Sequence, residues 1–344
     1  MNRLSPRRVQ SLLAAARRTR ILIVGDLMLD QFLWGRVTRI SPEAPVPVVE
    51  FERESFMPGG AANVAANAAA LGARTSLCGV TGRDPAARRL LRLIQSQRVD
   101  CGGIVATSGR MTSRKIRVIA HQQQVARVDR ETRSEITPAL TRQLLQFARR
   151  ELLRCDAVVV GDYGKGVVTQ SLLDELKRLC HARGIWLSVD PKPVHDLDLA
   201  GVSLITPNRK EAFELAGLTD PGRTPDPRTD PALRAMADRL LNRLRPALLL
   251  VTLGDQGLWL CGRNREPFQI PTMAREVFDV SGAGDTVIAT FTVAIAAGAA
   301  PEEAAMLSNQ AAGIVVGKVG TALVAPEELM VSCRTPGRRT DAGG

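Results

Sequence analysis

Ile21-Leu22-Ile23-Val24-Gly25 is a short, continuous apolar run near the start of the chain. Such a run is typical of a β-strand that is buried on both faces of a sheet. Four later runs predict further strands of this kind: Ala157–Gly161, Ile185–Val189, Val202–Thr206 and Leu248–Leu253. Helical patterns are also present, and the clearest are Ala61–Leu71, Pro138–Leu153, Gln170–Ala182, Lys210–Leu215 and Pro231–Leu244. The alternation predicts an α/β domain with a mostly parallel central sheet between layers of helices.

Two stretches interrupt this alternation. Phe32–Phe51 and Thr112–Asp129 each place spaced apolar residues on both sides of a turn, which is typical of hairpin strands. We expect them to form a small antiparallel sheet set apart from the main body. A sheet in that position, from about residues 32–52 and 112–129, is suited to act as a lid.

The 344-residue chain carries a formal net charge of +11, but much of this charge lies near its ends. Residues 1–20 hold six arginines and no acidic residue. Aromatic residues make up 3% of the chain, which leaves few rings on which nucleic-acid bases could stack. We therefore expect no nucleic-acid partner and favour a small anionic substrate. No apolar run approaches the roughly 20 residues of a membrane span, so we expect no membrane partner either.

Six cysteines and three histidines are scattered along the chain without a CxxC pair. This distribution predicts no zinc site and favours a reducing, cytoplasmic compartment. Ser5 and Pro6 precede a helical pattern that makes residues 1–20 a basic N-terminal helix. We expect the main domain to span residues 21–330 and residues 331–344 to form a flexible tail.

The most informative motif is Asp279-Val280-Ser281-Gly282-Ala283-Gly284-Asp285, which precedes an apolar helix predicted over Thr286–Ala297. Small residues before a helix let backbone N–H groups converge on an anion, and the helix dipole favours negative charge there. Asp285 lies in the first turn, where a carboxylate can take a proton from a hydroxyl nucleophile. The alternative is an ordinary glycine turn whose Asp stabilises the helix start, and the motif alone leaves both open.

A second glycine cluster is Gly59-Gly60-Ala61-Ala62-Asn63. Its small residues allow a ligand close to the backbone, and Asn63 offers both a donor and an acceptor. Tight packing of the helix on the sheet explains the cluster equally well.

A third segment, Thr206–Glu211, places Asn208 and Glu211 three residues apart in a first helical turn. These side chains could together hold hydrated Mg²⁺ and phosphate oxygens. Taken alone, the spacing is explained better by a capping box, in which the two residues cap their own helix.

Several common motifs are absent from the sequence. There is no GxxxxGK[ST] phosphate loop, no GxGxxG after a strand and no GxSxG element. A Walker-type nucleotide site, a dinucleotide-binding fold and a serine hydrolase are therefore disfavoured.

The three motifs, in this order, resemble those of the ribokinase-like (PfkB-type) carbohydrate kinases. That family carries a GG-x-x-N segment near its N-terminus, an NxxE segment and a DxxGAGD segment near its C-terminus, and the resemblance covers roughly residues 20–326. It implies a ribokinase-like three-layer α/β fold with a β-sheet lid. It also implies a sugar substrate, ATP and Mg²⁺.

A finer resemblance is to the D-glycero-D-manno-heptose 7-phosphate kinase branch of the family. It is carried by the segments Gly25–Asp30, Arg39–Val48, Gln122–Asp129, Asp162–Gly166 and Val189–Lys192. The branch implies phosphorylation of O1 of the heptose 7-phosphate to the 1,7-bisphosphate, on the route to nucleotide-activated heptose for lipopolysaccharide. Many relatives are fused to a nucleotidyltransferase domain with an HxGH motif, which this sequence lacks, so we expect a stand-alone kinase.

The resemblance also implies roles for individual residues. Asp285 would be the catalytic base, and the amides of Gly282, Ala283 and Gly284 would form the anion hole. Glu211 would bind Mg²⁺ through water. The residues expected to bind ATP are Asn208, Glu211, Thr252, Gly254, Gly257 and Asn309, with residues 315–320 beside the adenine. The residues expected to hold the sugar are Asp30, Gly59, Gly60, Asn63, Asp162 and Asp190, and those for its 7-phosphate are Lys115, Arg127, Lys165 and Lys192.

The acceptor side departs from the family pattern. Gly161-Asp162-Tyr163 replaces the Ser-Asp-Tyr of many relatives, and Pro193-Val194-His195 replaces a glycine-containing run. Another phosphorylated sugar, such as a fructose phosphate, therefore remains an alternative acceptor. A catalytically idle sugar-binding regulator is the alternative from another functional class. As in many relatives, we expect a homodimer whose lids meet across a two-fold axis.

Overall fold

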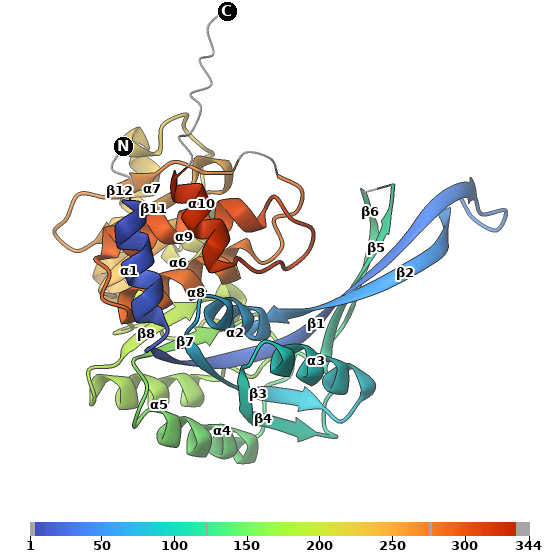
Figure 1. Cartoon of the computed structure of the whole chain (residues 1–344), viewed down its shortest axis with the longest axis horizontal. Coiled ribbons are helices and arrows are strands. Elements are labelled where there is room, and N and C mark those ends of the chain that lie inside the picture. Colours follow the sequence, from blue (N-terminus) through green and yellow to red (C-terminus); the bar gives the residue numbers. More distant parts are fainter. Residues whose placement is uncertain (1–3, 122, 275–276, 335–344) are drawn as a thin grey trace, which may run out of the picture.

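Strand β1 (Arg20–Ile40) connects the two sheets of the computed structural model, which describes residues 4–121, 123–274 and 277–334. Its first part, through Asp26, pairs in parallel with β3 and β7 in the main sheet. Its remaining part pairs with β2 and β5 in a second sheet. Figure 1 shows this second sheet, the lid, extending away from the main body. The lid is thus a continuation of the main sheet.

The main sheet has nine strands among the described residues, in the order β12-β11-β10-β9-β8-β7-β1-β3-β4. All neighbours pair in parallel except β10 with β11 and β11 with β12. The remaining bounds are β3 (Arg74–Gly82), β4 (Asp100–Thr107), β7 (Ala157–Gly161), β8 (Trp186–Asp190), β9 (Leu204–Ile205), β10 (Leu248–Thr252), β11 (Leu258–Gly262) and β12 (Phe268–Ile270). The expected mostly parallel sheet is confirmed, although the strand predicted at Val202–Thr206 is only two residues long.

Helices cover both faces of the main sheet because its strands are apolar on both. Ile21 and Ile23 point into one core, and Leu22 and Val24 point into the other. The first core is covered by α1 (Pro6–Ala16), α2 (Ala61–Ala70), α3 (Pro85–Ser96), α8 (Ala283–Ala296), α9 (Pro301–Val315) and α10 (Pro326–Arg334). The second is covered by α4 (Pro138–Glu151), α5 (Gln170–His181), α6 (Arg209–Ala216) and α7 (Pro231–Leu244). The expected three-layer arrangement is confirmed.

The lid sheet has the order β2-β1-β5-β6, with β2 at Pro47–Gly60, β5 at Ser113–Ala120 and β6 at Gln123–Arg130. The two hairpins predicted from the sequence are present, because β1 pairs with β2 and β5 with β6 in antiparallel fashion. The hairpins join through a parallel pairing of β1 with β5. The small lid sheet is therefore confirmed, but the prediction that it is antiparallel was wrong for the pairing of β1 with β5. One strand can serve both sheets because β1 continues for 14 residues beyond the last main-sheet pair.

The terminal segments were only partly predicted. Helix α1 is capped by Ser5, as expected, and packs against α10 and α8. The predicted tail begins too early, because α10 continues to Arg334. Residues 1–3 of the predicted basic helix, Gln122 and residues 335–344 of the predicted tail lie outside the described residues. Among the described helices, none has both the length and the apolar character needed to cross a membrane.

Candidate active site

The sites predicted from the sequence gather where the parallel strands of the main sheet end. Asp26 forms the last main-sheet pair of β1, Asp162 follows β7, Asp190 ends β8 and Thr252 ends β10. Ligands of open α/β sheets bind at this edge, because the loops after the strands leave a crevice there. The edge therefore brings together residues that are far apart in the chain.

Two helices that face this edge begin without a side-chain cap. Helices α2 and α8 begin at Gly60 and Gly282, both with positive φ. Six other helices begin at residues whose side chains accept hydrogen bonds from the first turn, namely Ser5, Asp84, Thr137, Thr169, Asn208 and Asp230. The first N–H groups of a helix need a partner from outside the helix. An uncapped helix start in a crevice is suited to bind an anion.

The predicted anion hole has one open position and one engaged amide. The Ala283 N–H donates to the Val280 carbonyl at 3.2 Å. A Cβ added at Gly284 would meet no atom within 4 Å, so an anion can approach the backbone there. Gly282, with φ +78°, adopts a left-handed conformation that favours glycine, and a Cβ there would lie 2.6 Å from Asn63 Nδ2.

Asp285 lies in the first turn of α8, is 8% exposed and accepts two short hydrogen bonds. Tyr163 donates its hydroxyl to Oδ1 at 2.6 Å, and Asn63 Nδ2 donates to Oδ2 at 2.7 Å. Burial raises the pKa of Asp285, and the hydrogen bonds from Tyr163 and Asn63 oppose this rise because they favour the carboxylate. Asp285 is thus a buried, oriented carboxylate at the uncapped helix start.

Asn67 holds Asn63 in position from the next turn of α2. Its amide nitrogen donates to the carbonyl oxygen of Asn63 at 3.0 Å and to Asn63 Oδ1 at 3.1 Å. Its own oxygen accepts from Thr286 Oγ1 at 3.2 Å, which ties α2 to α8. Because Asn63 Oδ1 accepts this bond, its amide nitrogen is directed to Asp285.

The loop after β7 is organised by Asp26, which is fully buried. Its carboxylate accepts from the backbone N–H groups of Tyr163, Lys165 and Val167 at 2.9–3.0 Å. These three bonds shape the loop from which the Tyr163 hydroxyl reaches Asp285. Asp26 therefore positions Tyr163 without touching Asp285 itself.

The lid places a second charged cluster near Asp285. Asp30 on β1 pairs with Arg117 on β5, whose guanidinium also lies 5.3 Å from the centre of the Phe32 ring. Burial raises the pKa of Asp30, and the charge of Arg117 opposes the rise. Burial lowers the pKa of Lys115, and the positive charges of Lys165 and Arg117 add to this effect, whereas Asp30 opposes it. The cluster where the lid meets the sheet edge thus combines the basic side chains of Lys115 and Arg117 with the buried carboxylate of Asp30.

The two predicted sugar-binding glycines lie at the end of β2, close to this cluster. A Cβ at Gly59 would collide with the Asp30 carboxylate. A Cβ at Gly60, which has φ +58°, would lie 2.7 Å from the Asp26 carbonyl oxygen. Both positions therefore require glycine for the close approach of β2 to β1.

The other basic residues predicted for the substrate phosphate have acidic partners. Lys165 pairs with Glu131 at 2.6 Å, and Lys192 pairs with Glu211 at 2.6 Å. Arg127, on the exposed strand β6, pairs with Asp129 at 3.0 Å. Arg127 lies opposite Arg117 in the β5–β6 register, so both belong to the same face of the lid.

Asp162 and Asp190, both predicted to bind sugar, are largely buried and differ in their contacts. Asp162 accepts from the Gly164 N–H at 3.0 Å and lies 3.0 Å from His195 Nδ1. Burial raises its pKa to about 6. Burial also raises the pKa of Asp190, and the nearby charges of Asp285 and Glu211 raise it further. In this structure Asp162 organises the loop after β7 and joins it to the residues after β8.

Asn208 and Glu211, predicted to bind ATP, form the capping box of α6. Asn208 Oδ1 accepts from the Glu211 N–H at 3.0 Å, and Glu211 Oε2 accepts from the Asn208 N–H at 3.1 Å. The capping box, which was the alternative to a nucleotide site in the sequence analysis, is therefore present. It does not exclude nucleotide contacts, because the box lies at the ligand-binding edge.

The remaining residues predicted for ATP lie beside this box. Thr252 donates its N–H to the Pro207 carbonyl at 3.0 Å, next to Asn208. Gly254 and Gly257 shape the turn between β10 and β11, both with positive φ. Asn309, on α9, is buried and donates to the Pro271 carbonyl at 2.7 Å. Asp279 accepts from the Gly320 N–H at 3.0 Å, which connects the glycine motif to the segment expected beside adenine.

Sequence reasoning missed four residues of this site. In the sequence Asp26 and Tyr163 are only members of motifs, and Asn67 and Arg117 belong to no motif. The sequence does indicate Asn67, because it follows Asn63 by one helical turn and so lies on the same face of the helix. Arg117 lies two residues after Lys115 along β5 and so shares its face.

Solved structures define the class of fold. The ribokinase of Arabidopsis thaliana, complexed with ribose and ATP, superimposes with a TM-score of 0.72 at 17% identity, covering 92% of this chain and 99% of that one. Phosphofructokinase-2 from Escherichia coli, in complex with potassium, superimposes with a TM-score of 0.74 at 21% identity. The match covers 92% of this chain and 98% of that one. The protein therefore has the ribokinase-like fold.

The sequence comparisons define the family. Residues 18–328 match the pfkB family carbohydrate kinases, and the chain belongs to this family. The bifunctional protein HldE of Desulfatibacillum aliphaticivorans is 44% identical over 310 residues, which are 90% of this chain and 62% of that protein. The protein of the same name from Geobacter sulfurreducens is 44% identical over 324 residues, which are 94% of this chain and 65% of that protein. The chain thus spans less than two thirds of the length of these curated relatives.

Proposed function

We propose that the protein is an ATP-dependent sugar kinase that transfers a phosphoryl group to O1 of D-glycero-D-manno-heptose 7-phosphate, giving the 1,7-bisphosphate. The supporting observation is the oriented Asp285 carboxylate at the uncapped start of α8, with a basic cluster on the lid close by. The first feature suits phosphoryl transfer to a hydroxyl group, and the second suits an acceptor that already carries a phosphate. The product would serve the synthesis of nucleotide-activated heptose for lipopolysaccharide.

The chemistry follows from the residues of the site. Asp285 takes the proton of the sugar hydroxyl as that oxygen forms a bond to the γ-phosphorus and the bond to ADP breaks. Asn63 and Tyr163 orient the carboxylate through its two oxygens. The backbone at Gly284 and the dipole of α8 stabilise the charge that develops on the transferred phosphoryl group. General-base catalysis of this kind contributes roughly 10²–10⁴-fold to the rate.

Mg²⁺, implied by the family, is compatible with the donors present at this edge. No group of three or more His, Cys, Asp or Glu side chains in the described part of the chain is arranged to hold a metal. Mg²⁺ is usually held by one or two carboxylates together with water and substrate phosphates. Glu211 is the carboxylate we assign to it, and because both its oxygens already accept hydrogen bonds, a contact through water fits best. When bound, the ion would neutralise charge on the ATP phosphates.

An acceptor phosphate would be held by the basic residues where the lid meets the sheet edge. The charges of Asp30, Asp285, Lys165 and Arg117 all act on the pKa of Lys115. A phosphate monoester carries close to two negative charges at neutral pH, and Lys and Arg are its usual ligands. We therefore assign the 7-phosphate to this cluster and add Arg117 to the four basic residues expected from the sequence.

The choice of heptose is supported by sequence segments and relatives. The segments Gly25–Asp30 and Arg39–Val48 resemble the heptose kinase branch, and relatives at 44% identity are named bifunctional protein HldE. A fructose phosphate is the alternative acceptor. A protein that binds sugar without turning it over is the alternative from another class.

An acceptor panel tests the proposal. Purified protein, ATP and Mg²⁺ would be incubated with the heptose 7-phosphate, fructose phosphates and unphosphorylated hexoses. ADP release would report turnover, and ³¹P NMR the position of the new phosphate. We expect turnover of the heptose phosphate with a new anomeric phosphate. Faster turnover of a fructose phosphate would support the alternative acceptor, and no ADP release with any sugar would support the idle regulator.

A Lys115→Ala variant tests the phosphate assignment within the same panel. We expect a raised KM for phosphorylated acceptors and no change in the KM for ATP. Arg130→Ala is a matched control, because Arg130 also lies on the lid but alternates with Asp129 and so faces the other side of β6. Equal effects of both variants, or an effect on ATP alone, would contradict the assignment.

We also propose a cytoplasmic homodimer that joins through the lid. The lid exposes several large apolar side chains, namely those of Ile40, Val46, Phe51, Val125 and Val128. Apolar groups on an exposed sheet are suited to be covered by a second copy. Sedimentation equilibrium at micromolar concentration is expected to give a dimer, and a Phe51→Glu variant to shift it toward monomer. A wild-type monomer would rule the dimer out.

A further inference from the structure

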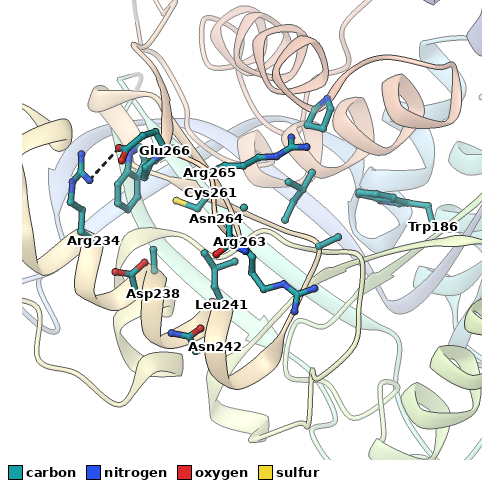
Figure 2. Close-up of a pocket in the computed structure, with 17 residues that line it drawn as sticks. Trp186, Arg234, Asp238, Leu241, Asn242, Cys261, Arg263, Asn264, Arg265 and Glu266 are labelled. Carbon is teal, nitrogen blue, oxygen red and sulfur yellow. Dashed lines mark hydrogen bonds and ion pairs between the residues drawn. The ribbon is translucent and has the colours of Figure 1, made fainter.

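A cavity of about 1200 Å³ lies at the opposite edge of the main sheet from Asp285. Its lining includes Trp186 at the start of β8 and Leu248 at the start of β10. The turn between β11 and β12 and one side of α7 complete its walls, as Figure 2 shows. Ligand sites usually occupy about 300–1,000 Å³, so the cavity has room for a small organic molecule.

Three arginines line this cavity, two of them on the turn between β11 and β12. Arg234 on α7 pairs with Glu266 at 3.4 Å, and Arg265 pairs with Glu302 at 4.0 Å. These ion pairs are long and exposed, so each contributes little to the stability of the fold. Arg263 has no acidic partner within 4.0 Å in the part of the chain that the structure describes. Asp238 and Glu266 also line the cavity. The Arg263 guanidinium is therefore the one most available to an anion with several oxygens, and the weak pairs of Arg234 and Arg265 would have to exchange partners.

The cavity also contains polar groups suited to a neutral part of a ligand. Trp259 is fully buried, and its Nε1 has no hydrogen-bond partner among the described residues. This N–H is shielded from the cavity, so the Trp259 ring packs behind the cavity wall and offers a ligand no hydrogen bond. Asn242 and Asn264 add amide groups that can bind hydroxyl or ring nitrogen atoms.

We propose that this cavity is a second binding site, and that it takes a phosphate monoester of a sugar or nucleoside. The arginines would hold the phosphate, and the asparagines and Trp186 would contact the rest of the ligand. Strands β8 and β10 begin at the cavity and end at Asp190 and Thr252 in the active site. A ligand bound here would therefore touch strands that also carry the catalytic edge.

Tryptophan fluorescence isolates this site. The chain has three Trp residues, of which Trp186 and Trp259 line the cavity and Trp34 lies in the lid. In a Trp34→Phe variant, all tryptophan emission therefore comes from the cavity. Ribose 5-phosphate, AMP and inorganic phosphate would be titrated separately, and the organic probe that binds more tightly identifies the sugar or the nucleoside as the ligand. We expect a saturable change with at least one organic phosphate.

Variants on this background assign the signal. Arg263→Ala combined with Arg265→Ala should raise the Kd about tenfold or more, because two charge-assisted contacts are lost. Arg239→Ala removes one positive charge from the exposed face of α7 outside the cavity and should leave the Kd unchanged. Lys115→Ala, which alters the proposed acceptor site, should leave the signal intact. Circular dichroism would confirm that each variant is folded.

Four results would overturn the proposal. Three are the absence of a saturable change with any probe at millimolar concentration, an unchanged Kd in the folded double-arginine variant, and loss of the signal in Lys115→Ala. A response to inorganic phosphate alone would also count against it, because the cavity would then hold an adventitious anion only.

Discussion

Helices α6 and α8 begin at the same edge of the main sheet, but their first turns are used differently. In α6 the side chains of Asn208 and Glu211 satisfy the backbone of their own helix start. In α8 the start is Gly282, and the acidic residue of the first turn, Asp285, bonds to α2 and to the loop after β7. A capped start stabilises its own helix, whereas an uncapped one is left for a ligand. The comparison supports our proposal that the reaction centre lies at the start of α8.

The strongest test of this difference removes the charge at the start of α8. Asp285→Asn keeps the size of the side chain but cannot accept a proton, so we expect kcat to fall by roughly 10²–10⁴-fold. Thermal unfolding and ATP binding should change little. Steady-state kinetics and calorimetry would measure the two quantities. A variant with the wild-type rate would show that Asp285 is not the base.

Two glycine substitutions separate backbone strain from filling of the anion site. Gly282→Ala places a Cβ at a position with φ +78° and 2.6 Å from Asn63 Nδ2, so we expect a loss of roughly 1–2 kcal/mol of stability together with a loss of activity. Gly284→Ala enters open space and should lower kcat without a change in stability. Chemical denaturation and turnover would be measured for both. An active Gly284→Ala would place the phosphoryl group elsewhere.

Asn208→Ala tests the other side of the comparison. Loss of the cap at α6 should cost about 1 kcal/mol of stability. If Asn208 also contacts the nucleotide, as the family resemblance implies, the KM for ATP should rise severalfold while the KM for the sugar stays constant. Thermal unfolding and two-substrate kinetics would be compared with Thr169→Ala, which removes the cap of α5. The same loss of stability with an unchanged KM would limit Asn208 to capping.

The smallest expected effect concerns the pH dependence. The Tyr163 hydroxyl lowers the pKa of Asp285 against the larger effect of burial. Tyr163→Phe should therefore raise this pKa, so that the base becomes protonated, and activity is lost, at a higher pH than in the wild type. The acid limb of kcat/KM against pH would shift to higher pH. A shift to lower pH, or none, would contradict the assigned hydrogen bond.

Residues of the site differ in how far the sequence revealed them. Gly282, Gly284 and Asp285 were predicted because small residues before an apolar helix have a direct local meaning. Tyr163 escaped because nothing near it in the chain shows that Asp26, on another strand, accepts from three N–H groups of its loop. Arg127 and Arg117 look alike as sequence, yet only Arg117 meets a buried acid. Such distinctions depend on which strands become neighbours.

The sequence by itself determined the alternation of strands and helices, the glycine turn before α8 and the two hairpins of the lid, because each depends on residues close together in the chain. Only the tertiary structure decided that β1 serves both sheets, that β5 joins it in parallel, and that Asn63, Tyr163 and Asp285 meet. The contacts of Asp285 with Asn63 and Tyr163 join residues separated by more than 100 positions. Short-range patterns carry little information about such pairings, because they are set by the packing of the whole domain.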